Sequence, residues 1–276
     1  MTVTEAFSPS SSSRSAIARA FTDARRDGAA LPGFPGGRLP DSLAEAYAVQ
    51  DAAIALWPHR IVGWKVGRIV EPTASQVGAD RLMGPIFAPR LWQAGAAPTA
   101  VPVFAGGFAA VEAEFVIRIG QDADPARTAY TLEEAAALVG GFHVGIEMAG
   151  SPLATINALG PIAVVSDFGN NNGLILGPEL MGWQERPWET LRCETFIEGV
   201  SVGTGTAADL PGGPISALRF ALETGARRGR PLRAGDLIST GAVTGIHDIT
   251  AGQRARVTFP NRHEIHCVTE PAAGMV

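Results

Sequence analysis

The sequence contains few of the residues that would indicate a thiolate metal site, a basic binding surface or a membrane span. Only two cysteines are present, Cys193 and Cys267, and neither has a second thiol nearby, so we interpret both as packed interior residues. No basic cluster is longer than Arg25-Arg26 or Arg227-Arg228, and the formal net charge is −5, which argues against a nucleic-acid or anionic membrane partner. No apolar run reaches the roughly 18 residues of a membrane span, and the serine-rich start lacks the apolar core of a signal peptide. We therefore expect a cytoplasmic protein with a small-molecule substrate.

Hydrophobic residues, in contrast, make up 46% of the 276 residues, which is enough for one large core or two small ones. The 33 glycines and 20 prolines imply many turns. Together with short runs rich in Val, Ile and Phe, they predict an α+β protein with a β-rich body and a few helices.

The chain divides into three parts. The first part has low complexity, and we expect it to be disordered. The second has helical periodicity after Ser15 and again after Ser42, where Ser42 and Glu45 have the spacing of a capping box. The third has strand patterns. The predicted parts are a disordered N-terminus at 1–13, a helical cap at 14–59 and a β-rich catalytic domain at 60–276.

Two glutamates, Glu112 and Glu114, interrupt the apolar and β-prone run 111–119. In a strand these side chains share a face, with their Cα atoms roughly 7 Å apart. One interpretation is a half-buried strand that shows its polar side to water. However, Val116 shares the same face, and a buried unpaired charge is unfavourable. A hard divalent cation, Mg²⁺ or Mn²⁺, would balance both carboxylates.

A third carboxylate, Glu147, lies in the strand pattern 141–148, and we predict that it completes the metal site. His143 has the same parity, but a single histidine on a strand is more often a structural residue.

Lys65 lies between two glycines in the short strand pattern 61–67. It is either an exposed strand residue or a cation that faces an anionic substrate, because Gly63 and Gly67 allow backbone or ligand to approach closely.

Further substrate contacts are predicted in two polar loops. Asn171 belongs to an asparagine-rich turn, which either simply makes the turn or presents amides to a carboxylate. Thr240 and Thr244 lie in a loop rich in glycine and hydroxyl groups. We predict that Asn171, Thr240 and Thr244 bind substrate together with Lys65.

Taken together, residues 15–270 resemble the 2-keto-4-pentenoate hydratase family, within the fumarylacetoacetate hydrolase superfamily. The resemblance depends on the order and spacing of five short motifs: Gly63–Gly67, Glu112–Glu114, Ile146–Glu147, Gly173–Gly177 and Gly235–Gly241.

This resemblance implies a twisted, mixed β-roll with flanking helices. It also implies a Mg²⁺ or Mn²⁺ ion on Glu112, Glu114 and Glu147, and an active-site lysine at Lys65. The substrates of the family are 2-oxo acids or their enols, chelated through the 2-oxo group and the carboxylate. A homo-oligomer is implied as well.

The sequence departs from the hydratase pattern near the expected substrate pocket. Hydratases usually continue the third ligand with an aspartate and an arginine, and here the segment 147–152 has neither. The loop 241–244 and the turn 167–173 also differ from the usual pattern. These departures lie near the expected substrate pocket, so they affect the identity of the substrate more than the binding of the metal.

Three functional hypotheses follow. The first is a hydro-lyase that adds water to a 2-hydroxy-dienoic acid of the 2-keto-4-pentenoate type. The second is a decarboxylase or C–C bond hydrolase that acts on a 2,4-dioxo acid, because the same chelated substrate serves these reactions. The third is a catalytically silent protein that uses the fold to bind a small acid.

Overall fold

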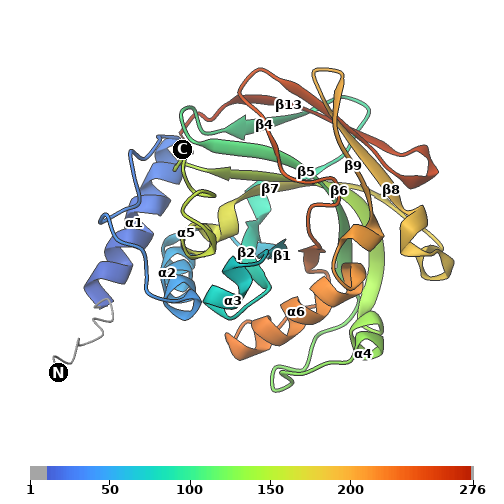
Figure 1. Cartoon of the computed structure of the whole chain (residues 1–276), viewed down its shortest axis with the longest axis horizontal. Helices are drawn as coiled ribbons and strands as arrows, with labels where there is room; N and C mark the ends of the chain where they lie inside the picture. The colour runs from blue at the N-terminus through green and yellow to red at the C-terminus, as the bar shows by residue number, and fades with distance from the viewer. Residues whose placement is uncertain (1–10, 275–276) are drawn as a thin grey trace.

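The computed structural model describes residues 11–274, in which two β-sheets are surrounded by helices (Figure 1). The helices are α1 (Ser11–Asp27), α2 (Leu43–Leu56), α3 (Thr73–Val77), α4 (Leu132–Ala136), α5 (Pro161–Ser166) and α6 (Gly213–Arg227). The strands are β1 (Ile61–Arg68), β2 (Arg81–Phe87), β3 (Leu91–Gln93), β4 (Thr99–Val103), β5 (Phe108–Ile119), β6 (Val139–Ser151), β7 (Asn171–Glu179), β8 (Arg192–Ile197), β9 (Val200–Thr206), β10 (Leu237–Ser239), β11 (His247–Asp248), β12 (Arg254–Thr258) and β13 (Glu264–Pro271). Short 3-10 helices connect several of them: η1 (Ala88–Arg90), η2 (Phe168–Asn170), η3 (Trp183–Glu185), η4 (Trp188–Thr190), η5 (Ala207–Asp209) and η6 (Pro260–Arg262).

The larger sheet is mixed and curls around the middle of the molecule. Its strand order is β2-β1-β10-β5-β6-β7-β3, with β11 paired to β5. The pairs β1–β10 and β3–β7 are parallel, and the other pairs are antiparallel. The long strands β5 and β6 form the centre of this sheet, so residues on one face of both strands lie close together.

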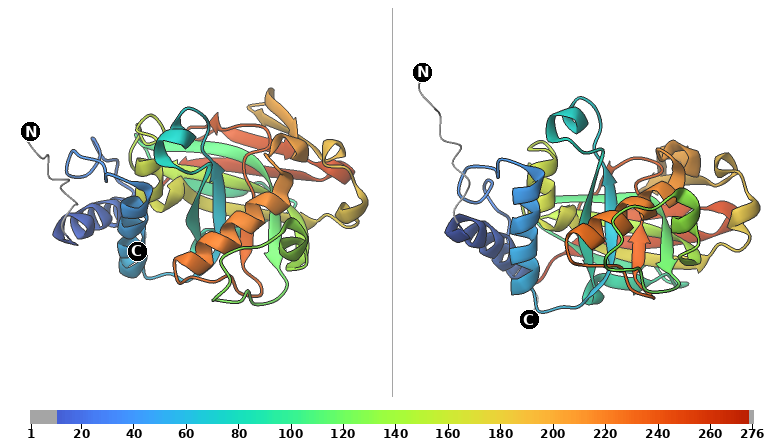
Figure 2. Two further views of the ribbon diagram at one scale, coloured as in Figure 1. Left: turned by 60° about the horizontal axis from the view of Figure 1, so that its bottom comes forward. Right: turned by 90° about the horizontal axis from the view of Figure 1, so that it is seen from below.

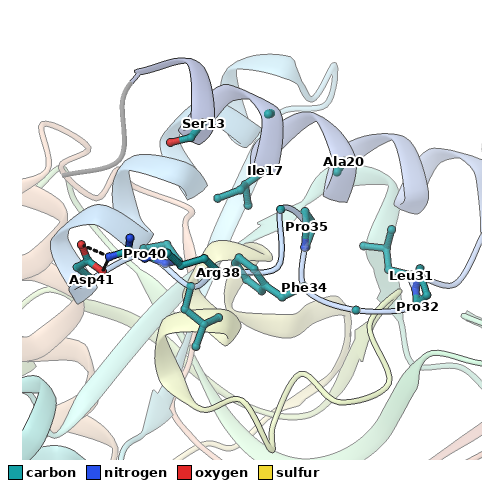
Figure 3. A pocket seen from close by; sticks show the side chains of 14 residues that line it. Ser13, Ile17, Ala20, Leu31, Pro32, Phe34, Pro35, Arg38, Pro40 and Asp41 are labelled. Carbon is teal, nitrogen blue, oxygen red and sulfur yellow. Dashed lines mark hydrogen bonds and ion pairs between the residues drawn. The ribbon is translucent and has the colours of Figure 1, made fainter. Parts of the chain in front are cut away.

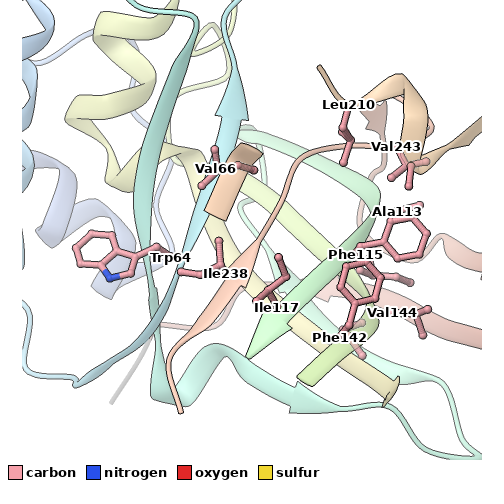
Figure 4. Close-up of a cluster of buried hydrophobic side chains, with 14 of the residues drawn as sticks. Trp64, Val66, Ala113, Phe115, Ile117, Phe142, Val144, Leu210, Ile238 and Val243 are labelled. Carbon is pink, nitrogen blue, oxygen red and sulfur yellow. The ribbon is translucent and has the colours of Figure 1, made fainter. Parts of the chain in front are cut away.

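The second sheet has the order β4-β13-β12-β8-β9 and packs over one face of the first. The main hydrophobic core fills the space between the sheets and α6. Phe115 of β5 and Phe142 of β6 stack there with their ring centroids 5.4 Å apart (Figure 4). Because side chains alternate along a strand, burying Ala113, Phe115 and Ile117 in this core turns Glu112 and Glu114 to the opposite face.

The helices α1 and α2 pack against each other at one end of the molecule, and α2 also packs against α5 (Figure 2). A second core lies between these helices, with Phe21, Leu153 and Phe168 fully or almost fully buried. None of the helices in residues 11–274 combines the length and apolar character of a membrane span.

The mixed α+β roll is confirmed, and so is the N-cap of α2, where the Ser42 hydroxyl accepts from the backbone N–H of Glu45. The segment after β1 forms α3, and β2 begins at Arg81. Strand β2 contains Pro85, which a strand tolerates only at a sheet edge, and β2 is an edge strand.

The described residues cover only part of the predicted N-terminal segments. Residues 1–10 of the segment that we expected to be disordered lie outside the described residues, and α1 begins at Ser11 rather than after residue 13. The division between a helical cap and a catalytic domain at 59/60 stays a prediction.

Candidate metal and substrate site

Strand register brings three glutamates together on one face of the larger sheet. Glu112 of β5 and Glu147 of β6 are directly opposite in the antiparallel pair, and Glu114 lies two residues along β5. One carboxylate oxygen of each residue lies within 4.8 Å of the others. All three side chains are buried, at 3% exposure for Glu112 and 0% for Glu114 and Glu147. The interpretation of Glu112 and Glu114 as the wet face of a strand is therefore excluded.

These carboxylates make only part of the hydrogen bonds that buried anions require. One oxygen of each glutamate has no donor among residues 11–274. Burial and the charge of Glu147 raise the pKa of Glu112 to about 8, although Lys65 offsets part of the effect. Burial and the two neighbouring carboxylates also raise the pKa of Glu114 well above its usual value. Without a cation the cluster therefore holds protons near neutral pH.

Lys65 is the only lysine of the sequence, and its ammonium group lies beside the cluster. Its Nζ atom is 3.4 Å from Oε1 of Glu147 and 3.2 Å from Oδ1 of Asn170. The side chain is 6% exposed, so the interpretation as an exposed strand residue is excluded. Burial alone lowers the pKa of Lys65, but the three carboxylates more than offset burial and raise it.

The loop after β10 holds Glu114 in place. Oε2 of Glu114 accepts hydrogen bonds from the Ser239 hydroxyl at 2.5 Å and from the Gly241 N–H at 2.8 Å. Sequence reasoning did not single out Ser239. The available signal was its position in the strand pattern that precedes the hydroxyl-rich loop. In the structure Ser239 is the register partner of Lys65 in the parallel pair β1–β10.

The asparagine-rich turn contacts the site with two residues. Asn171 was predicted to bind substrate, but its Nδ2 atom donates to Oε1 of Glu147 at 3.0 Å. The amide of Asn170, which we did not predict, accepts from Lys65 and lines the substrate cavity. The structure therefore directs Asn171 to a predicted metal ligand and Asn170 to the lysine.

The two predicted threonines differ in position. Thr240 lines the cavity next to the cluster, and its hydroxyl donates to the Phe115 carbonyl at 2.8 Å. Thr244 does not line this cavity, because its hydroxyl lies 2.8 Å from that of Thr195 in the second sheet. Our prediction that Thr244 binds substrate has no support in this geometry.

A cavity of about 470 Å³ leads from the cluster to the surface. Lys65, Glu112 and Asn170 line its inner end, and the wall is mostly apolar, with Leu82 and Leu210 among its residues. Such a shape suits a small acid whose polar end lies at the cluster.

A larger cavity, of about 800 Å³, lies between α1 and the segment 31–41 (Figure 3). Its walls are mainly apolar side chains, and the charged pair Arg38–Asp41 forms its own ion pair at 2.8 Å. It contains no cluster of titratable groups that would support chemistry. The cavity at the glutamates is therefore the candidate substrate site.

Comparisons with known proteins agree with this fold. The family model described as "Fumarylacetoacetate (FAA) hydrolase C-terminal" matches residues 84–270, more than half of the chain. The chain belongs to the fumarylacetoacetate hydrolase family. It is 29% identical over 211 residues to 2-keto-4-pentenoate hydratase of Paraburkholderia xenovorans (strain LB400), which covers 74% of this chain and 76% of that protein.

Several solved structures share the fold. A 4-oxalocrotonate decarboxylase from Pseudomonas putida G7, complexed with magnesium and adipate, has a TM-score of 0.77 and 20% identity, with 95% of this chain and 98% of that chain covered. A fumarylpyruvate hydrolase from Pseudomonas aeruginosa, in complex with Mn²⁺ and pyruvate, has a TM-score of 0.54 and 20% identity, with 78% and 91% covered. At this identity the likeness establishes the fold and leaves the reaction open.

The residues of this chain fit a divalent cation. The donors would be carboxylate oxygens, which suit hard ions such as Mg²⁺ and Mn²⁺. Each of the three glutamates has an oxygen without a hydrogen-bond donor in the described part of the chain. The raised pKa values of Glu112 and Glu114 are the expected sign of a cluster that lacks its counter-charge.

Proposed function

We propose that the protein is a divalent-metal-dependent hydratase that acts on a small 2-hydroxy-dienoic acid of the 2-keto-4-pentenoate type. The observation that supports the proposal best is the buried cluster of Glu112, Glu114 and Glu147 beside the only lysine of the chain, at the inner end of a cavity. These glutamates would hold Mg²⁺ or Mn²⁺. The sequence likeness to a 2-keto-4-pentenoate hydratase supports the choice of substrate.

Held by Glu112, Glu114 and Glu147, a divalent ion would supply Lewis-acid stabilisation of the negative charge that develops on the C2 oxygen of the substrate. Three carboxylates and one divalent ion leave a net charge of −1, so an anionic substrate needs a further cation. Lys65 supplies it, because its Nζ atom lies 3.4 Å from Glu147 at the inner end of the cavity. We assign to Lys65 the anchoring of the substrate carboxylate and the delivery of a proton.

The remaining residues line the cavity and hold these groups in position. The apolar wall would contact the unsaturated part of the substrate, and the water that the hydration needs would enter through the mouth. Asn170 orients the lysine through its amide oxygen, and Thr240 lies at the inner end of the same cavity.

The test uses a purified conjugated dienol acid and its ultraviolet absorbance, with and without Mg²⁺. We expect Mg²⁺-dependent loss of absorbance and a product that has gained the mass of water. Glu147→Gln should abolish this activity, whereas Glu189→Gln, an exposed glutamate, should not change it. Binding of the acid without any change in absorbance would instead support the silent binding protein.

A decarboxylase is the second candidate, because the outer end of the cavity carries positive charge. Arg68 and Arg81 line the cavity. Residues 65–68 all border the cavity, so the cavity passes around the end of β1. No acidic group lies within ion-pair distance of Arg68 in the described residues, whereas Arg81 pairs with Asp80. Burial and the guanidinium groups of Arg219 and Arg68 lower the pKa of Arg81, while Asp80 raises it.

These arginines suit a substrate with a second carboxylate. A residue rise of about 3.3 Å places the Cα atoms of Lys65 and Arg68 about 10 Å apart, and both residues border the same cavity. The related decarboxylase structure contains adipate, which is a diacid of this kind.

Product analysis separates the two candidates, because decarboxylation releases CO₂ and hydration adds water. With a dicarboxylic substrate, Arg68→Gln should raise KM about tenfold, and Arg192→Gln, an exposed arginine away from the cavity, should not. An equal KM for the Arg68→Gln variant would remove the argument for a diacid.

A further inference from the structure

Arg25 is a buried cation on α1 that contacts the segments next to the glutamate cluster. Its side chain is 5% exposed. The guanidinium donates to both carboxylate oxygens of Asp167, at 2.5 and 3.0 Å, to the Gly150 carbonyl at 2.9 Å and to the Asn171 carbonyl at 3.0 Å. One side chain therefore joins α1 to the end of β6 and to both ends of the turn 167–171.

This turn has an unfavourable backbone conformation. Phe168, Gly169 and Asn170 all have positive φ angles, of 54°, 66° and 51°. Residues other than glycine seldom adopt such angles, and they do so where the surrounding structure enforces them. Arg25 holds the residues that flank this segment, and its guanidinium lies 5.3 Å from the centroid of the Phe168 ring.

The same turn carries the two amides that contact the site. Asn170 accepts from Lys65, and Asn171 donates to Glu147. A change in the turn would move both amides together, because they are consecutive residues. The contacts therefore run from Arg25 through the turn to the lysine and to one predicted metal ligand.

We propose that Arg25 is a positioning residue for the metal site, and that α1 is thereby part of the functional site although it lies outside residues 84–270 of the family match. The proposal rests on the metal site proposed above. Arg25 itself touches neither the glutamates nor the substrate cavity. Its effect is transmitted by the orientation of the Asn170 and Asn171 amides.

The competing explanation is that the Arg25–Asp167 pair only fastens α1 to the body of the protein. Asp167 also accepts from the Ser151 hydroxyl at 2.6 Å, so the pair has such a structural role in any case. The two explanations differ in what they predict for a folded variant. A fastening role changes stability alone, whereas a positioning role changes the metal site at unchanged fold.

The experiment measures the Mn²⁺ affinity and the electron paramagnetic resonance spectrum of bound Mn²⁺, together with the melting temperature. We expect Arg25→Ala to weaken Mn²⁺ binding about 10- to 100-fold, the usual cost of losing an outer-shell contact, and to change the zero-field splitting of the bound ion. Millimolar guanidinium should restore affinity in Arg25→Ala by filling the vacated position.

Two variants on the same helix serve as matched controls. Arg26→Ala removes the adjacent arginine, which is exposed and pairs only with Asp23 in the described residues. Phe21→Leu loosens the packing of α1, because Phe21 is fully buried, but keeps every contact of Arg25. We expect both to bind Mn²⁺ like the wild type, even where Phe21→Leu lowers the melting temperature.

A folded Arg25→Ala variant with wild-type Mn²⁺ affinity and spectrum would overturn the proposal. If Arg25→Ala does not fold, Arg25→Met combined with Asp167→Asn removes both charges without leaving one unpaired, and the same loss of affinity is required of it. A wild-type protein that binds no Mn²⁺ would instead overturn the proposed function, so the two failures are distinguishable.

Discussion

Metal binding should depend steeply on pH, because the metal-free cluster holds protons that a cation must displace. Burial and the charge of Glu147 raise the pKa of Glu112 to about 8, and the pKa of Glu114 is also raised. Carboxylates bind a metal only in their ionised form, so each bound ion releases protons.

The magnitude follows from Glu112 alone. With a pKa of about 8, its carboxylate is ionised in about 1% of molecules at pH 6 and in about half at pH 8. The apparent Kd for Mn²⁺ should therefore fall about 50-fold between these pH values, which corresponds to about 2.3 kcal/mol. The raised pKa of Glu114 acts in the same direction.

The stability of the metal-free protein should also depend on pH. Between the ordinary glutamate pKa of 4.5 and about 8, the native state holds a proton on Glu112 that the unfolded chain has released. Stability therefore falls as pH rises through this range, since the native state binds more protons than the unfolded state. Saturating Mg²⁺ should remove this dependence of stability on pH, because metal binding displaces the proton from Glu112.

The assay is a Mn²⁺ titration followed by the free-ion resonance signal at pH 6, 7 and 8. Calorimetry in two buffers of different ionisation enthalpy counts the released protons. Glu189→Gln, an exposed substitution, should leave the pH dependence unchanged, whereas Glu112→Gln should bind weakly and with a shallower slope. Equal Mn²⁺ affinity at pH 6 and 8, without proton release, would refute the reasoning.

Three further predictions follow from the site and the core. Lys65→Met should lower kcat/KM more than tenfold without weakening Mn²⁺ binding, because it removes a positive charge beside the cluster; activity within tenfold of wild type would end its catalytic role. Mg²⁺ at about 100 times its Kd should stabilise the EDTA-treated protein by about 2.7 kcal/mol, seen as a rise of roughly 5–10 °C in melting temperature, and an unchanged melting temperature would contradict a metal site. Phe115→Ala should cost about 3–5 kcal/mol in urea unfolding, because Phe115 is fully buried against Phe142; a loss below about 1 kcal/mol would show that this stack contributes little.

Many of the elements and the acidic residues of the candidate site were predictable because they depend on local periodicity. Alternation along 111–119 placed Glu112 and Glu114 on one face, and the structure has both on β5 with buried side chains. The capping box at Thr131–Glu134, which begins α4, likewise depends on residues three positions apart. These features need only neighbours within a few residues, so the sequence alone contains the information.

Contacts across the fold were predictable only in part. An asparagine-rich turn was evident, but which amide faces Lys65 and which faces Glu147 depends on the positive φ angles of the turn. The strand patterns also did not reveal that Thr244 turns toward Thr195 of the second sheet. A one-residue shift of strand register, or a change of φ from negative to positive, turns a side chain in another direction. The local sequence pattern does not contain this information.

The amino-acid sequence by itself determined the α+β class, the three acidic residues and the lone lysine, because composition and strand alternation are properties of the chain. Only the tertiary structure decided that Glu147 lies opposite Glu112, that Lys65 lies beside both, and that Arg25 is buried against Asp167. Arg25 follows Phe21 by four residues and so shares the buried stripe of α1, which was the available signal. Its partner is 142 residues away, and packing of the whole chain is what brings such distant charges together.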